Sequence, residues 1–83
     1  MWYVYIVECS DGSLYTGIST DVNKRIETHN KGKGAKYTKT KLPVVLRASF
    51  DGFEDRSSAS KEEYRIKQLT RKAKLELCYI YGK

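Results

Sequence analysis

The pattern of hydrophobic and polar positions along the chain predicts short elements of two kinds. Three segments rich in aromatic and β-branched residues predict strands, at residues 2–7, 13–18 and 44–50. Three segments with capping residues and apolar positions at helical spacing predict helices: from a cap at residues 19–21 to about Asn30, from a cap at residues 55–58 to about Leu69, and over residues 71–79. The order β-β-α-β-α-α indicates an α+β fold, with helices flanking a small three-stranded antiparallel sheet.

The first two strands are separated by residues 10–12 (Ser-Asp-Gly), which predict a tight hairpin. A two-residue turn would place Tyr5 and Tyr15 on opposite faces of the sheet. A three-residue loop, with Gly12 in the left-handed region, would place both tyrosines on one face and pair Tyr5 with Gly17. Both turns are chemically acceptable, so the local sequence leaves the register open.

The length of 83 residues predicts one domain, residues 1–83, with little room for a small-molecule cofactor. The longest uncharged apolar run, residues 1–7, is far short of the roughly 20 residues that span a membrane and does not resemble a secretory signal. We therefore exclude the membrane and secreted classes. Two cysteines, Cys9 and Cys78, are too few for a zinc site or a disulfide framework. We interpret them as buried residues of a cytoplasmic protein rather than a bridge or a reactive thiol.

The positive charge is concentrated in one stretch of the chain. Residues 31–47 contain six basic and no acidic side chains, within a formal net charge of +6. Its glycines and proline predict an irregular loop, poorly ordered without a ligand. Lysines can displace counterions from a nucleic-acid backbone, and a tyrosine ring can stack on a base. We predict nucleic-acid contacts there, against the alternative of a solvated loop, from Lys31, Lys33, Lys36, Tyr37, Lys39 and Lys41.

Two adjacent carboxylates in the second predicted helix are candidate metal ligands. Glu62 and Glu63 lie three and four residues after Ala59, so at least one of them points partly inward. An inward carboxylate is costly unless a positive group meets it. The alternative is an exposed acidic pair that forms salt bridges to Arg65 and Lys67. Spacing alone does not decide between a metal ligand and a surface pair.

Several residues along the chain form a series: Tyr3-Val-Tyr5, Tyr15-Thr-Gly17, Arg25, His29 and Glu63. This series resembles the GIY-YIG nuclease family over residues 2–77. Singly, each residue has a structural explanation, as a core aromatic, a surface cation or a helix-end cap. The chain departs from the family pattern with Tyr3 in a glycine position, Thr16 in place of isoleucine, and Ile18 where the repair nucleases have lysine. It also has no asparagine after Asn30, and we expect no separate DNA-binding domain within its 83 residues.

This resemblance implies a divalent-metal-dependent endonuclease that hydrolyses DNA phosphodiester bonds, like the short stand-alone bacterial members of the family. The family's A-x-x-x-E segment selects Glu63 over Glu62 as the ligand of a single Mg²⁺ ion, with Mn²⁺ as a possible substitute. The partner would be DNA, including branched or damaged DNA. A non-catalytic nucleic-acid-binding module of the same fold is the alternative. A protein-interaction domain is a weaker third reading, because the excess charge favours polyanions.

The resemblance also implies a role for each site residue. Tyr5 or Tyr15 would activate the attacking water, and Arg25 would bind the phosphate. His29 would relay a proton or orient the water. Gly17 would leave the backbone open opposite Tyr5 so that the substrate can approach. We therefore predict the three-residue hairpin loop, because only that register puts both tyrosines on one face.

Overall fold

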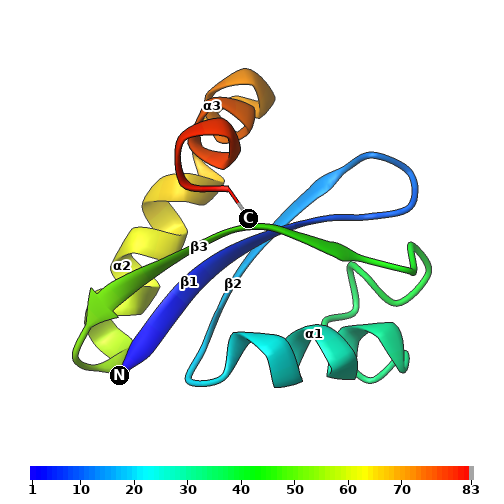
Figure 1. Ribbon diagram of the computed structural model, residues 1–83, viewed down its shortest axis with the longest axis horizontal. Helices are drawn as coiled ribbons and strands as arrows, with labels where there is room; N and C mark the ends of the chain where they lie inside the picture. Colours follow the sequence, from blue (N-terminus) through cyan, green and yellow to red (C-terminus); the bar gives the residue numbers. More distant parts are fainter. Residues whose placement is uncertain (83) are drawn as a thin grey trace.

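The computed structural model describes residues 1–82 and contains the predicted elements in the predicted order (Figure 1). The strands are β1 (Trp2–Glu8), β2 (Leu14–Ser19) and β3 (Val45–Phe53). The helices are α1 (Val22–Asn30), α2 (Arg56–Lys67) and α3 (Arg71–Tyr81). The strands form one antiparallel sheet in the order β2-β1-β3, which confirms the α+β class. In residues 1–82, no helix combines the length and the apolar character that crossing a membrane requires.

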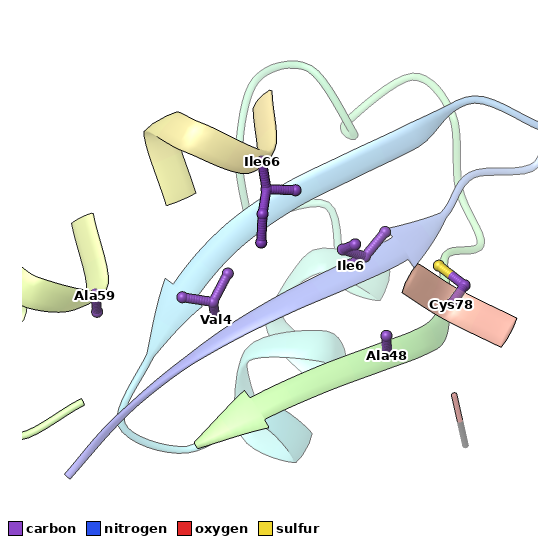
Figure 2. Close-up of a cluster of buried hydrophobic side chains, with 6 residues drawn as sticks. All are labelled: Val4, Ile6, Ala48, Ala59, Ile66 and Cys78. Carbon is purple, nitrogen blue, oxygen red and sulfur yellow. The ribbon is translucent and has the colours of Figure 1, made fainter. Parts of the chain in front are cut away.

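The central strand β1 supplies both faces of the sheet with buried side chains. Val4 and Ile6 are fully buried under α2 and α3, in a cluster with Ala48, Ala59, Ile66 and Cys78 (Figure 2). Tyr5 and Val7 point to the opposite face, where Val22 and Ile26 of α1 pack against them. The helices therefore cover both faces of the sheet. Because successive side chains of β1 point to opposite faces, this one strand contributes to the core on the α1 side and to the core on the α2–α3 side.

The two cysteines belong to these different layers. Cys9 packs on the α1 side of the sheet and Cys78 on the α2–α3 side, and both are buried and unpaired. The interpretation as buried thiols rather than a disulfide bridge is confirmed.

The hairpin between β1 and β2 has the register that puts both tyrosines on one face. Tyr5 pairs with Gly17 and Val7 pairs with Tyr15, so the three-residue loop is confirmed. The Cys9 amide donates to the Ser13 carbonyl at 2.8 Å and closes the loop. The loop depends on a glycine at position 12, where φ is +84°.

Each helix begins at a residue whose side chain accepts a backbone N–H. Asp21 caps α1, Asp55 caps α2 and Thr70 caps α3. The first two caps lie within the stretches that the sequence indicated. The main differences from the prediction are in the lengths of two elements. β3 ends at Phe53 rather than at residue 50, and α3 ends at Tyr81 rather than at residue 79.

The lysine-rich segment between α1 and β3 is attached more firmly than its composition predicts. The Asn30 side chain accepts from the Val44 amide at 2.7 Å and donates to the Val44 carbonyl at 3.2 Å, so that it joins the two ends of the loop. Midway, the hydroxyl of Thr38 is fully buried. Further on, the Lys41 carbonyl accepts from the Ser10 amide at 2.9 Å. The loop is tied to α1, β3 and the hairpin rather than standing free.

Candidate active site

A hydrogen bond between Tyr5 and His29 lies at the centre of the candidate site. Tyr5 is on the α1 side of β1, and His29 is the buried residue of α1. The Tyr5 Oη and His29 Nε2 atoms are 2.9 Å apart, and both residues are almost completely buried. The resemblance assigned both residues to the site, and the fold brings them into direct contact.

Burial keeps both groups of this pair neutral at neutral pH. Burial raises the pKa of the Tyr5 phenol, and the nearby Arg25 guanidinium opposes that rise. Burial also lowers the pKa of His29, and the same guanidinium lowers it further. A protonated phenol therefore faces an uncharged imidazole. This arrangement can pass a proton from the oxygen to the nitrogen when a negative charge develops nearby.

Gly17 allows the Tyr5 ring to lie flat across β2. A Cβ at position 17 would be 2.5 Å from the Tyr5 hydroxyl oxygen and 2.6 Å from the ring carbon that bears it. The space over this glycine is thus filled by Tyr5, and not left open for the substrate as the sequence suggested. Gly17 is needed at this position because it lets the phenol reach His29.

Tyr15 is half-buried and lies beside His29 on the same face of the sheet. Its ring centroid is 5.5 Å from that of His29. Tyr37 from the lysine-rich loop stacks on Tyr15 with a centroid separation of 5.8 Å and an interplanar angle of 22°. Lys67 of α2 also lies near Tyr15, and its Nζ atom is 5.8 Å from the centroid of the Tyr15 ring. Tyr15 is therefore the point where β2, the loop and α2 meet.

The two adjacent glutamates of α2 have different partners. Arg65 binds both carboxylate oxygens of Glu62, at 2.7 and 2.8 Å, and lowers the pKa of that carboxyl. Glu63 has one longer contact, 3.4 Å from the Nζ of Lys67. Its charge is also close enough to Tyr5 to contribute to the raised pKa of that phenol. Both salt bridges considered from the sequence are present. Of the two carboxylates, Glu63 is the one beside the tyrosines.

The lysines of the loop divide into two groups. Lys41 is engaged, 3.4 Å from an Asp11 carboxylate oxygen and 3.9 Å from the Tyr37 ring centroid. Hydrogen bonds from Ser13 lower the pKa of Asp11 to about 2, so the partner of Lys41 stays ionised. Within residues 1–82, the other four loop lysines are exposed and form no ion pair: Lys31, Lys33, Lys36 and Lys39. Their charges are available to a polyanion.

The donor set fits a hard cation that retains much of its water. In residues 1–82, no group of three or more His, Cys, Asp or Glu side chains converges on one point. A structural zinc ion requires such a group. Mg²⁺ is typically bound by one or two carboxylates, with waters and substrate phosphates as its other ligands. The single carboxylate of Glu63, close enough to Tyr5 to influence its pKa, meets that requirement.

Comparison with known proteins shows the family to which the chain belongs. Residues 1–76 match the family described as the GIY-YIG catalytic domain. The chain is 57% identical over 75 residues to a UPF0213 protein of Staphylococcus aureus, covering 90% of each sequence. Its fold is similar to the solution NMR structure of the UPF0213 protein BH0048 from Bacillus halodurans, with a TM-score of 0.61 and 47% identity over 99% of this chain and 87% of that one. It is also similar to the protein EF2693 from E. faecalis, with a TM-score of 0.55 and 44% identity over 87% and 76% of the two chains.

The chain therefore belongs to the GIY-YIG family, which is a family of nucleases. Every residue of the candidate site lies within the matched residues 1–76.

Four residues that shape the site were not assigned to it from the sequence. Lys67 was considered only as a partner of a surface glutamate, and its i,i+4 spacing from Glu63 was the available signal. Asn30, Gly34 and Thr38 lie in or next to the lysine-rich loop. Their signal was weaker, a short run of glycine and threonine directly after the helix that carries His29.

Proposed function

We propose that this protein is a divalent-metal-dependent endonuclease that hydrolyses phosphodiester bonds of DNA. In the proposed reaction, the oxygen of a water molecule bonds to phosphorus and one P–O ester bond breaks, which leaves a phosphate monoester and a hydroxyl. The observation that carries the proposal is the buried 2.9 Å hydrogen bond between Tyr5 and His29, next to the Arg25 guanidinium. A merely structural tyrosine does not need a buried imidazole as its partner.

Tyr5 is our candidate for the residue that accepts the proton of the attacking water. A phenol is a poor base at neutral pH unless its own proton can leave. His29 provides the destination, because its Nε2 atom is 2.9 Å from the phenol oxygen. As the water transfers a proton to Tyr5, the phenol transfers its own proton to His29. The resulting imidazolium remains beside the negative charge that develops on the phosphate.

Arg25 and Tyr15 would position the phosphate. Arg25 is the cation whose charge acts on both Tyr5 and His29, and its guanidinium can bind two phosphate oxygens at once. Tyr15 is more exposed than Tyr5 and lies between Tyr37 of the loop and Lys67. The exposed lysines at positions 31, 33, 36 and 39 would bind phosphates on either side of the scissile bond.

Glu63 is the proposed ligand of the divalent ion, Mg²⁺ or Mn²⁺. When bound, such an ion would supply Lewis-acid stabilisation of the phosphate oxygens and of the leaving group. The bidentate Arg65 contact keeps Glu62 away from this role. The two unpaired cysteines are consistent with a reducing compartment, and we place the protein in the cytoplasm.

The test is nicking of plasmid DNA and of branched DNA with Mg²⁺ or Mn²⁺. Glu63→Gln should abolish cleavage while leaving the fold and most of the DNA affinity unchanged, because only the charge is removed. Glu62→Gln, one position away, is the matched control and should cleave nearly normally. Tyr5→Phe should lose about 10²–10⁴-fold, the usual contribution of general base catalysis. Arg25→Ala should lose both cleavage and some affinity.

The outcomes separate the two candidate functions. Equal trace activity in the wild type and in Glu63→Gln would mean contamination, and the protein would then be a nucleic-acid-binding module without catalysis. The unpaired lysines of the loop are the feature that favours that second function. Loss of cleavage in Glu62→Gln instead would mean that the metal ligand has been assigned one residue out of place.

A further inference from the structure

Thr38 is the residue of the lysine-rich loop that enters the interior. It lies between the exposed Lys36 and Lys39, yet its exposed fraction is 0%. Its Oγ1 atom is 2.8 Å from His29 Nδ1 and 3.0 Å from the Ala35 carbonyl oxygen. The loop thus reaches the nitrogen of His29 that faces away from Tyr5.

These distances determine which atom donates the proton in each hydrogen bond from the Ala35 carbonyl through Thr38 and His29 to Tyr5. The Ala35 carbonyl can only accept, so the single proton of the Thr38 hydroxyl is donated to it. The Thr38 oxygen then accepts from His29 Nδ1–H. In a neutral imidazole the other nitrogen, Nε2, carries no proton and accepts from the Tyr5 hydroxyl.

The opposite arrangement satisfies fewer groups. If Thr38 donated to His29 Nδ1, Nε2–H would donate to Tyr5. The buried Tyr5 proton would then lack an acceptor, because His29 is the only acceptor in contact with Tyr5 Oη among residues 1–82, and the nearby Arg25 guanidinium can only donate. A buried donor without an acceptor is destabilising, so the first arrangement is favoured.

Gly34 makes the approach of the loop possible. A Cβ at this position would overlap the Nδ1 atom of His29 and would be 2.8 Å from its Cα. The backbone of the loop therefore lies directly against the imidazole. The Asn30–Val44 hydrogen bonds fix the two ends of the same loop. The position of Thr38 is thus set by contacts on both sides of it in the sequence.

We propose that Thr38 is a positioning residue of the active site: by accepting a hydrogen bond from Nδ1, it holds His29 in the tautomer that receives the proton of Tyr5. This inference rests on the proposed function, since the tautomer matters only if Tyr5 transfers its proton. Thr38 is no part of the residue series that identified the family. It also links the lysine-rich loop to the proton transfer, because the residue that orients His29 lies in the same short segment as Lys36 and Lys39.

The experiment reads the tautomer directly and does not depend on cleavage. His29 is the only histidine of the chain, so two-bond ¹H–¹⁵N correlation spectra of protein labelled at histidine contain one imidazole. The wild type should show a protonated Nδ1 and a bare Nε2. Thr38→Val keeps the shape but removes the acceptor, and should shift the population towards the Nε2–H form. Thr38→Ser should restore the wild-type spectrum, and Thr40→Val on the exposed part of the loop should leave it unchanged.

Cleavage by the same variants gives the second readout. We expect Thr38→Val to lose at least tenfold in kcat with little change in DNA affinity, and Thr38→Ser to recover most of that loss. The proposal is overturned if wild-type His29 carries its proton on Nε2, or if Thr38→Val changes neither tautomer nor kcat. It is also overturned if the tautomer changes while kcat does not. Absence of cleavage in every protein, with the tautomers as expected, would refute the nuclease function but support the assignment of the tautomer to Thr38.

Discussion

Lys67 follows Glu63 by one helical turn on α2, and its Nζ atom is 3.4 Å from the Glu63 carboxylate. The same ammonium group is 5.8 Å from the centroid of the Tyr15 ring. The proposed metal ligand is therefore already paired with a cation that also faces a site residue. A metal ion that binds Glu63 must displace this lysine or share the carboxylate with it.

Replacing this lysine should strengthen metal binding. Lys67→Gln keeps most of the length of the side chain but removes the competing charge. A partly exposed ion pair contributes about 0.2–1 kcal/mol, so the affinity for Mn²⁺ should rise by up to about fivefold. Titration calorimetry with Mn²⁺ measures this change, and Lys61→Gln on the same helix is the control. An unchanged affinity would show that Lys67 leaves Glu63 at no cost.

The exposed lysines of the loop should dominate the salt dependence of DNA binding. Neutralising Lys33, Lys36 and Lys39 together removes three potential phosphate contacts. The slope of log K against log salt should become shallower by about 2.7, at roughly 0.9 for each contact. Fluorescence anisotropy with a labelled duplex at several salt concentrations provides the slope. In a variant with Lys72 and Lys74 neutralised, the slope should change less. Equal changes in both variants would place the binding surface elsewhere.

Thr16 occupies the position where the family pattern has isoleucine, and it carries an unsatisfied hydroxyl. Its Oγ1 is the one buried side-chain N or O atom in residues 1–82 without a hydrogen-bond partner. Thr16→Val keeps the shape and removes this group, so the free energy of unfolding should rise by about 1 kcal/mol. Urea denaturation measures the difference. Thr16→Ser retains the hydroxyl but loses a methyl group, and should be less stable than the wild type.

The stability of the protein should decrease as the pH falls below about 6.5. The pKa of His29 is lowered in the folded chain by burial and by Arg25, whereas an unfolded histidine titrates near 6.5. Between these two values the unfolded chain binds the proton more readily. The contribution of His29 to stability is therefore complete above about pH 6.5 and is lost progressively below it, until the folded pKa is reached. Urea midpoints between pH 5.5 and 8 measure this loss. A His29→Gln variant with the same pH dependence would contradict it.

The sequence was sufficient for the elements and for the register that gathers the tyrosines. The helix caps and strand compositions are local features, and local features of short elements can be read from a sequence. The hairpin required one additional constraint, because both turns were acceptable locally. That constraint was the requirement that Tyr5 and Tyr15 share a face, and the observed pairing of Tyr5 with Gly17 satisfies it.

The contacts of the loop could not be obtained in the same way. Thr38 is nine residues beyond His29, in a segment without helical or strand periodicity. Its burial depends on the path of the backbone, which depends in turn on Gly34 and on the Asn30 side chain. The role of Gly17 was misjudged for a similar reason. The sequence indicates that a small residue is needed, but not that the Tyr5 ring fills the space.

The Asn30–Val44 hydrogen bonds close residues 31–43 into a loop, and these bonds do not involve the residues between its two ends. Gly34 and Thr38 occupy fixed steps after His29, so the first part of the loop cannot change in length without disturbing the imidazole. Between Thr38 and Lys41, which is held by the hairpin, lie only Lys39 and Thr40. The Lys41 amide donates to the Thr38 carbonyl at 2.9 Å across these two residues, so an insertion there would break this turn and remove one of the contacts that hold Thr38. The spacing of the loop lysines is thus set by the same backbone contacts that place Thr38 against His29, and a change in the length of the loop would alter both together.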